Sequence, residues 1–310
     1  MEQSVKRHPV FTIQGLRCAI VFLCAFAFTG STDEEFDWKK AALEVKDYAF
    51  TTAYIDSIRS LYDVVEPSTP LRHVQAGSFR DGETLVYEVS WGVFRAGYVV
   101  LTTEPDLSNG TLRLGAKALS NNFVSAFYRM RDYVISTVDE KGMYPLIFEQ
   151  HLREGKKYKA DGWILYDHLK GKVHVQEKKF RTLDTPPFVH DYISVLYYAR
   201  TLSYTPGDTF TLNLFIHSKV HPIFFKCKGR KPVQVDCGTF NCIGLEPTLM
   251  GEGRAFNKKD KMEVWLTDDD KRVPIFIKSK IKVGSVVAKL VWKSNPEDIG
   301  LKSPAVEAHR

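Results

Sequence analysis

Hydrophobic and polar residues alternate along most of the chain between residues 83 and 292. A period of two places successive side chains on opposite faces of a β-strand. The first such run assigns one face to four residues, Leu85, Tyr87, Val89 and Trp91. Two further runs flank Asn109-Gly110, a dipeptide typical of tight hairpin turns. Since no strand–helix–strand rhythm follows, we predict a mainly β fold, a curved antiparallel sheet or an open barrel.

Helical spacing interrupts this pattern in two places. Residues 31–66 carry apolar residues at helical intervals without Gly or Pro, which predicts an N-terminal helical extension of one long or two short helices. Residues 191–202 predict one helix packed on the sheet, with Asp191 as its N-terminal cap and Ser194 as a local partner of the cap. We therefore divide the chain at the remaining composition changes: a linker at 67–78, an antiparallel β domain at 79–293 and a polar tail at 294–310.

The first thirty residues have the layout of a secretory signal peptide. Basic residues up to Arg17 precede an apolar run over 18–28, and small polar residues follow it. The run is shorter than the roughly 20 apolar residues of a membrane-spanning helix. Cleavage after Ala27 and cleavage a few residues later both fit the pattern. We expect an exported protein.

Export changes what the cysteines predict. Without the signal peptide, Cys227, Cys237 and Cys242 remain, and an oxidising compartment favours one disulfide and one free thiol. Their spacing does not decide the pairing. No Cys-x-x-Cys or His-x-x-x-His pair accompanies them, so we expect no metal site and no cofactor.

Charge and motifs exclude several functional classes. The formal charge is +6, of which residues 1–30 contribute three cations and one acid, and the remaining +4 is too small to indicate nucleic-acid binding. Glycine-rich phosphate loops, G-x-S-x-G and H-E-x-x-H are absent from the sequence, so we expect no enzyme. A hydrolase would require carboxylates that lie apart in the sequence and come together only on folding.

Two charged clusters each have a structural and a functional interpretation. The acids at 268–270 favour a turn over a calcium site, because Lys271 and Arg272 follow at once and adjacent residues cannot all face one ion. The basic run at 170–181 fits an edge strand protected by lysines, and it also fits contact with lipid phosphates. The structural interpretation is favoured in both cases.

Three stretches resemble the bacterial exported family known as domain of unknown function 3108. They are GETLVYEVSW at 82–91 with Ala96-Gly97, DYISVLYYAR at 191–200, and VWLTDD at 264–269 with Val273-Pro274 and KVGS at 282–285. The resemblance covers about residues 80–292 and implies a Gram-negative envelope protein rich in antiparallel strands, which we expect to be periplasmic or associated with the outer membrane. The chain is more distantly similar to periplasmic lipoprotein carriers, in which a curved sheet wraps helices and holds acyl chains.

These observations lead to a non-catalytic binding hypothesis. A concave β surface suits a lipid or another hydrophobic envelope component. The candidate ligand-binding residues, which alternation cannot distinguish from core residues, are Tyr87, Trp91, Tyr197, Arg200 and Trp265. The alternative is an envelope protein-protein interaction module that uses residues 33–65 as its contact surface, and a periplasmic hydrolase is the third hypothesis. Peripheral membrane contact is compatible with the first.

Overall fold

A computed structural model describes residues 37–45, 48–75, 79, 82–176, 180–249, 262–280 and 284–294. The predicted signal peptide and the polar tail beyond Ser294 lie outside the described residues.

The sheet contains fourteen strands within the described part of the chain, and every neighbouring pair is antiparallel. Its order is β8-β7-β6-β5-β4-β3-β2-β1-β14-β13-β12-β11-β10-β9. The first eight strands are β1 Glu83–Trp91, β2 Phe94–Asp106, β3 Thr111–Ser120, β4 Arg131–Asp139, β5 Pro145–Glu154, β6 Tyr158–Asp167, β7 Lys172–Gln176 and β8 Phe180–Asp184. The other six are β9 Thr209–Ile216, β10 Lys219–Val235, β11 Gly238–Leu249, β12 Met262–Thr267, β13 Pro274–Lys280 and β14 Ser285–Ser294. The predicted mainly β fold is confirmed.

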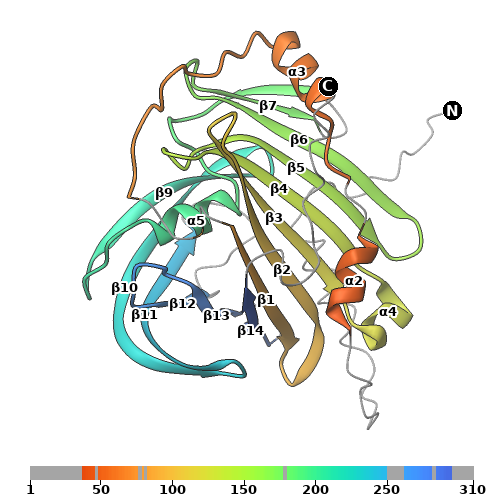
Figure 1. The fold of residues 1–310 in the computed structure, drawn as a ribbon, viewed down its shortest axis with the longest axis vertical. Helices are drawn as coiled ribbons and strands as arrows, with labels where there is room; N and C mark the ends of the chain where they lie inside the picture. The colour runs from red at the N-terminus through yellow and green to blue at the C-terminus, as the bar shows by residue number, and fades with distance from the viewer. Residues whose placement is uncertain are drawn as a thin grey trace, which may run out of the picture.

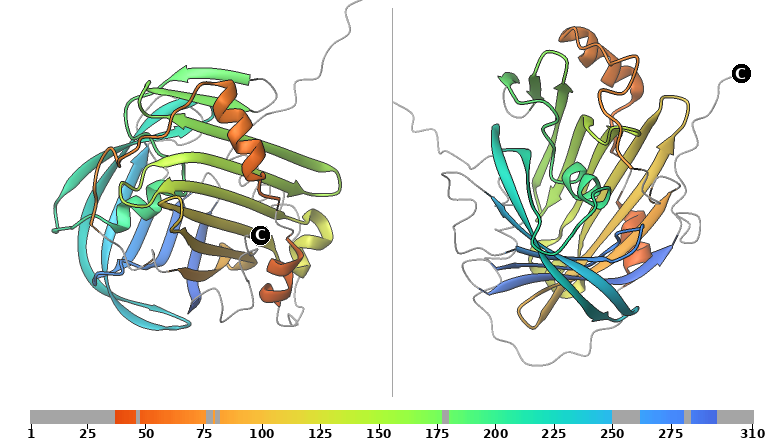
Figure 2. Two further views of the ribbon diagram at one scale, coloured as in Figure 1. Left: turned by 45° about the horizontal axis from the view of Figure 1, so that its top comes forward. Right: turned by 90° about the vertical axis from the view of Figure 1, so that its left-hand side faces the viewer.

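The connection between the two edge strands carries the central helix. Residues 185–208 lead from β8 to β9 and contain α5, Ser194–Arg200. Figures 1 and 2 show α5 inside the concavity of the curved sheet. A parallel bridge between His190 and Leu214 attaches this connection to β9. The chain between the two sheet edges therefore fills the space that the sheet encloses.

Apolar side chains cover both faces of the first half of the sheet. Three clusters surround α5, each with a residue of the α5 region: Tyr197 in the first, Val195 in the second and Leu196 packed against the third. On the other face, the N-terminal extension forms α2, Trp38–Glu44, and α3, Thr52–Leu61. Its apolar residues pack over Val86, Ile135, Ile147 and Trp163. The extension is thus two short helices, and it belongs to the core of the sheet.

The helices between the strands differ from the sequence prediction in two details. Helix α5 is shorter than 191–202, because Asp191 to Ile193 form its entry turn. A second short helix, α4 at Asn122–Tyr128, interrupts the strands where none was predicted. It begins at Asn121, whose side chain accepts a hydrogen bond from the Val124 amide at 2.9 Å. Seven residues provide too few turns for a helical period to be recognised.

The expectation of one disulfide was wrong. Cys227 and Cys242 are buried in different apolar clusters, Cys237 is exposed, and all three thiols are free. Strand register explains the separation, since Cys227 pairs with Leu245 and Cys242 pairs with Lys231 on the neighbouring strand.

Candidate functional site

The polar residues at the entrance of α5 satisfy one another. Asp191 Oδ1 accepts hydrogen bonds from the backbone amides of Ile193 and Ser194, both at 2.8 Å. Its Oδ2 accepts from the Ser136 hydroxyl at 2.6 Å, and Ser194 Oγ accepts from the Asp191 amide at 3.1 Å. Burial raises the pKa of the Asp191 carboxyl, and the hydrogen bonds from Ser136 and the two amides counteract that rise. Asp191 thus caps the entry turn of α5, with Ser194 as the predicted partner, although the residue directly before the helix is Ile193, which makes no side-chain cap.

Arg72 holds the segment before β1 against this entrance. Its guanidinium lies between two aromatic rings, 4.4 Å from the centroid of Phe188 and 4.1 Å from that of Tyr198. Arg72 Nε donates to the Gly142 carbonyl at 2.6 Å. Arg72 Nη2 lies 3.3 Å from His190 Nε2. Burial, and secondarily the Arg72 charge, keep the pKa of His190 well below its usual range, so the neutral ring accepts this hydrogen bond.

Three of the five sequence-predicted ligand residues come together at the other end of α5. Arg200 Nη1 and Nη2 donate to the two Glu83 carboxylate oxygens at 2.6 and 2.9 Å. Tyr197 is 1% exposed, and its hydroxyl has no hydrogen-bond partner. The Tyr87 hydroxyl donates to the Pro274 carbonyl at 2.8 Å, and burial raises the pKa of Tyr87 well above its usual range. This group joins α5 to β1 and to the start of β13.

The two predicted tryptophans occupy separate places. Trp265 packs in the same apolar cluster as Tyr87, and its indole N–H donates to Glu263 Oε1 at 2.9 Å. Trp91 is half-buried near Gly284, after a register shift that follows Val89. Position along the strand explains the separation, because Trp91 is the last residue of β1 and lies four residues, or about 13 Å, beyond Tyr87. The five residues therefore do not surround one common pocket.

One cavity lined by described residues measures about 10 Å³ and lies between the end of α3, the following segment and β5–β6. That is room for about one water molecule. A site for an acyl chain needs roughly 300–1,000 Å³. This cavity is therefore too small for an acyl chain, and on the concave side of the sheet three apolar clusters pack with the α5 region.

Asp132 and Glu154 form a carboxyl pair that the sequence analysis missed. They lie on the neighbouring strands β4 and β5 and are 9% and 5% exposed. The Arg153 amide donates to Asp132 Oδ1 at 2.8 Å, and the Tyr128 hydroxyl donates to Glu154 Oε2. Burial, with the charge and hydrogen bond of Glu154, raises the pKa of Asp132 to about 7. The one signal in the sequence was that alternation assigns both acids to the buried face.

Such a pair has the chemistry of a general acid and base, since one carboxyl keeps its proton near neutral pH. Access is the second requirement. Neither residue lines the cavity between α3 and β5–β6. The arrangement therefore matches a buried proton-sharing pair better than a hydrolytic site.

Replacing Asp132 with Asn is expected to raise the melting temperature, and to raise it more at about pH 8 than at about pH 5. The folded-state pKa of about 7 exceeds the ordinary value of about 3.9. The folded chain therefore keeps a proton that the unfolded chain releases, and the wild type loses stability as the pH rises from about 4 to 7. Thermal unfolding at both pH values checks this, with exposed Asp236→Asn as control. Equal effects at the two pH values would contradict the raised pKa.

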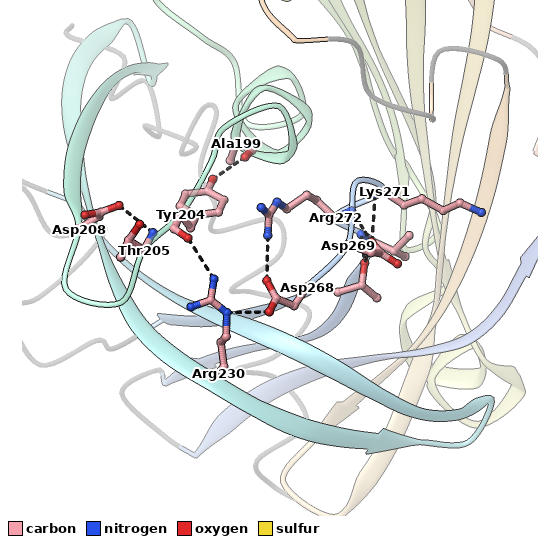
Figure 3. Close-up of polar contacts among 11 residues, drawn as sticks. Ala199, Tyr204, Thr205, Asp208, Arg230, Asp268, Asp269, Lys271 and Arg272 are labelled. Atoms are coloured by element: carbon pink, nitrogen blue, oxygen red, sulfur yellow. Dashed lines mark hydrogen bonds and ion pairs between the residues drawn. The ribbon is translucent and has the colours of Figure 1, made fainter.

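The acids at 268–270 form the predicted turn. Asp269 Oδ1 accepts from the amides of Lys271 and Arg272 at 3.0 and 3.1 Å. Figure 3 shows Asp268 between two guanidinium groups, with Arg230 at 2.7 Å and Arg272 at 3.4 Å. Across the residues that the structure describes, no group of three or more His, Cys, Asp and Glu side chains is placed to hold a metal ion.

The basic run at 170–181 lies on β7 and β8, and β8 is an edge of the sheet. Lys172 pairs with Asp184 at 2.7 Å, and Lys170 pairs with Asp63 at 3.1 Å. The His174 ring stacks on Tyr62 with centroids 4.2 Å apart. Arg181 lies on the edge strand β8, as the edge-strand interpretation predicts, whereas Lys172 lies on the inner strand β7 and Lys178 and Lys179 lie outside the described residues.

The fold and these contacts define a class of protein in which a strongly curved antiparallel sheet packs around a central helix. Residues 86–291 match the family described as protein of unknown function, DUF3108. The chain belongs to this family, as the resemblance of its three motifs predicted. No curated protein matches the chain.

One solved structure shares the fold at low sequence identity, and two others are reported beside it with lower TM-scores. A beta-barrel-like protein of the unknown-function family DUF1849 from Brucella abortus is 11% identical, with a TM-score of 0.52, over 72% of this chain and 99% of that one. A Bacteroides fragilis protein, provisionally described as exported and YmcC-like in fold, is 9% identical over the same shares, with a TM-score of 0.30. A provisionally described lipoprotein from Parabacteroides distasonis has 9% identity, a TM-score of 0.29 and the same coverage. Among the described residues, no helix has the length and apolar character to cross a membrane.

Proposed function

We propose that this protein is an exported, non-catalytic protein of the cell envelope that binds lipid at its surface. The observation that carries the proposal is the contrast between interior and exterior. Inside the sheet, the α5 region packs into three apolar clusters, and the cavity between α3 and β5–β6 measures about 10 Å³, whereas large apolar side chains are exposed at turns and helix ends, with Phe127 at 75% and Val93 at 90%. Grouped exposed apolar residues mark a binding surface more often than isolated ones do.

Export is supported by the N-terminal pattern of basic, apolar and small residues. The absence of recognisable catalytic motifs from the sequence supports a binding role. The buried Asp132–Glu154 pair is the observation that favours a hydrolase instead, and its position away from the cavity lining counts against that alternative.

Surface binding predicts two results for the mature protein purified without detergent. Its native mass spectrum is expected to show the chain without a stoichiometric lipid, because a lipid bound at the surface dissociates during purification. The same protein is expected to float with vesicles made from envelope phospholipids, without releasing fatty acid from them. A lipid adduct that survives purification would instead indicate an internal site, fatty-acid release would indicate a hydrolase, and failure to float would contradict lipid binding.

A protein partner is the second candidate, and the end of the extension favours it. Leu61 and Val65 are 72% and 63% exposed where α3 ends. Substituting both with Asp is expected to remove a partner that docks there, as measured by crosslinking in cells. Unchanged crosslinks in this variant would count against the second candidate.

A further inference from the structure

Three segments that are distant in sequence meet at one end of the sheet. They are the β1–β2 hairpin at 92–96, the α4 region at 122–129 and the β5–β6 hairpin at 155–160. Asn121 joins the first two, since its amide donates to the Ala96 carbonyl at 3.1 Å and its side-chain Nδ2 donates to the Arg95 carbonyl at 2.8 Å. The Gly155 amide donates to the Arg129 carbonyl at 2.8 Å and joins the third. Figure 1 shows α4 between the two hairpins, and we name this surface the basic end.

The basic end carries charge of one sign. Its three segments contain no Asp or Glu, and their five cations are Arg95, Arg129, Lys156, Lys157 and Lys159. All five are exposed. Arg95 pairs with Glu88 of β1 at 3.2 Å. The acids that flank the β5–β6 hairpin are Glu154, which is buried, and Asp161, which is 43% exposed and pairs with Arg153 at 2.8 Å. The surface is therefore suited to an anionic partner.

Large apolar side chains accompany these cations. Five are exposed within the three segments: Val93 at 90%, Phe94 at 48%, Phe123 at 43%, Phe127 at 75% and Tyr158 at 47%. The Phe123 and Phe127 rings contact each other edge-to-face, with centroids 5.7 Å apart. The five apolar side chains lie on α4 and on the two hairpins, so they project from the molecule. Cations beside projecting aromatic side chains are typical of segments that enter the interface of an anionic membrane.

The opposite end of the same strands lacks this combination. Its turns at 106–110, 139–144 and 167–171 also contain exposed apolar residues, with Leu107 at 82% and Leu169 at 56%. These turns hold four acids and two lysines, however. The two ends thus differ in charge while both expose apolar side chains, which makes the opposite end a matched control.

We propose that the basic end docks on the surface of an anionic lipid bilayer, with the α4 aromatic rings entering the interface and the lysines of the β5–β6 hairpin contacting the lipid phosphates. This inference rests on the proposed lipid-binding function and assigns its position and headgroup chemistry. The contacts at Asn121 and Gly155 keep the three segments together, so that they act as one surface.

The test measures partitioning of the mature protein onto vesicles of phosphatidylethanolamine with phosphatidylglycerol, and onto phosphatidylcholine vesicles. The wild type is expected to prefer the anionic vesicles and to dissociate as salt is added. Removing three cations with Lys156→Gln, Lys157→Gln and Lys159→Gln is expected to weaken partitioning about 100-fold. The pair Phe123→Ser and Phe127→Ser is expected to weaken it about 10–100-fold.

Matched controls separate these effects from changes in overall charge and folding. Lys141→Gln, Lys219→Gln and Lys226→Gln remove three exposed cations elsewhere, and Leu107→Ser removes an exposed apolar side chain at the opposite end. Both controls are expected to bind as the wild type does. All variants are expected to keep the wild-type melting temperature, since the substituted side chains are exposed.

Each outcome decides between the two proposals. If the wild type binds vesicles and the basic-end variants bind equally well, the docking surface is refuted while lipid binding stands. If the wild type binds no vesicle of either kind, the proposed function itself fails. The wild type could also bind a soluble polyanion such as polyphosphate as tightly as it binds anionic vesicles, with no effect of the phenylalanine substitutions. That result would indicate a polyanionic partner in place of a bilayer and would overturn the inference.

A fluorescent probe locates the contact independently of affinity. Phe127→Cys in a Cys237→Ser background, labelled with an environment-sensitive dye, is expected to shift its emission to the blue on anionic vesicles. The same dye at Leu107→Cys is expected to show no shift. A shift at Leu107 and none at Phe127 would place the contact at the opposite end.

Discussion

Replacing Arg200 with Met is expected to destabilise the protein by about 3–5 kcal/mol, because removing one partner leaves the other partner of a buried ion pair unpaired. The Arg200 side chain is 1% exposed and that of Glu83 is 14% exposed. Arg200 also donates to the Lys271 carbonyl at 3.0 Å, and its guanidinium lies 4.6 Å from the Phe79 ring centroid. We expect the melting temperature to fall by about 10 °C.

The exposed pair of Arg230 and Asp268 provides the matched control for this prediction. Its N–O distance is 2.7 Å, close to that of the buried pair, but the Arg230 side chain is 48% exposed. Arg230→Met is therefore expected to cost no more than about 1 kcal/mol. Adding Glu83→Gln to Arg200→Met is expected to recover part of the loss, since the buried charge disappears. Chemical denaturation of the four proteins measures this, and equal losses for Arg200→Met and Arg230→Met would contradict the buried role of Arg200.

Deleting residues 37–65 is expected to leave a chain that does not fold stably. The extension covers Ile147, Trp163 and Leu165, which are 0%, 1% and 1% exposed. Exposing three such side chains costs about 1.5–3 kcal/mol each. The sum is comparable to the whole stability of about 5–15 kcal/mol of an ordinary domain. The Glu149 carboxylate would also lose the Phe50 amide that it binds at 2.7 Å.

Soluble yield and a cooperative thermal transition measure the effect of the deletion. Ile58→Ala, at a 4% exposed position of α3, tests the same contact in the full chain and is expected to cost about 2–4 kcal/mol. Leu43→Ser, at a 58% exposed position of α2, is the control and is expected to change little. A truncated chain that melts at the wild-type temperature would show that the extension is an independent attachment to the β domain.

Local patterns predicted the strands well because each strand obeys its own period. Leu85 and Tyr87 share a cluster near α5, and Val86 between them contributes to the opposite cluster under the extension. The turn at Asn109-Gly110 was predicted from its residues alone, and Gly110 does have a positive φ of 62°. Capping was equally local, since Asp191 and Ser194 bind each other three residues apart.

Relations between distant segments could not be read in the same way. Arg200 and Glu83 are 117 residues apart in the chain, and no local pattern indicates that they pair. Asp132 and Glu154 meet only because β4 and β5 adopt one register. Alternation assigned Tyr87 and Trp265 to buried faces correctly, but it could not tell a packed core from a ligand pocket. The basic end was missed for a related reason, because its charges are spread over three short segments that lie together only in the folded sheet.

The strand order has a consequence for how the protein is made. Every neighbouring pair of strands is consecutive in the chain except β1 and β14, whose residues pair from Thr84 with Ser294 to Trp91 with Val286. Each half of the sheet can therefore grow hairpin by hairpin as the chain emerges. The edge of β1 that pairs with β14 stays unpaired until β14, the last of the described strands, has been synthesised. An unpaired edge favours association with other chains. A protein delayed at this stage would need protection by a chaperone until its two halves join.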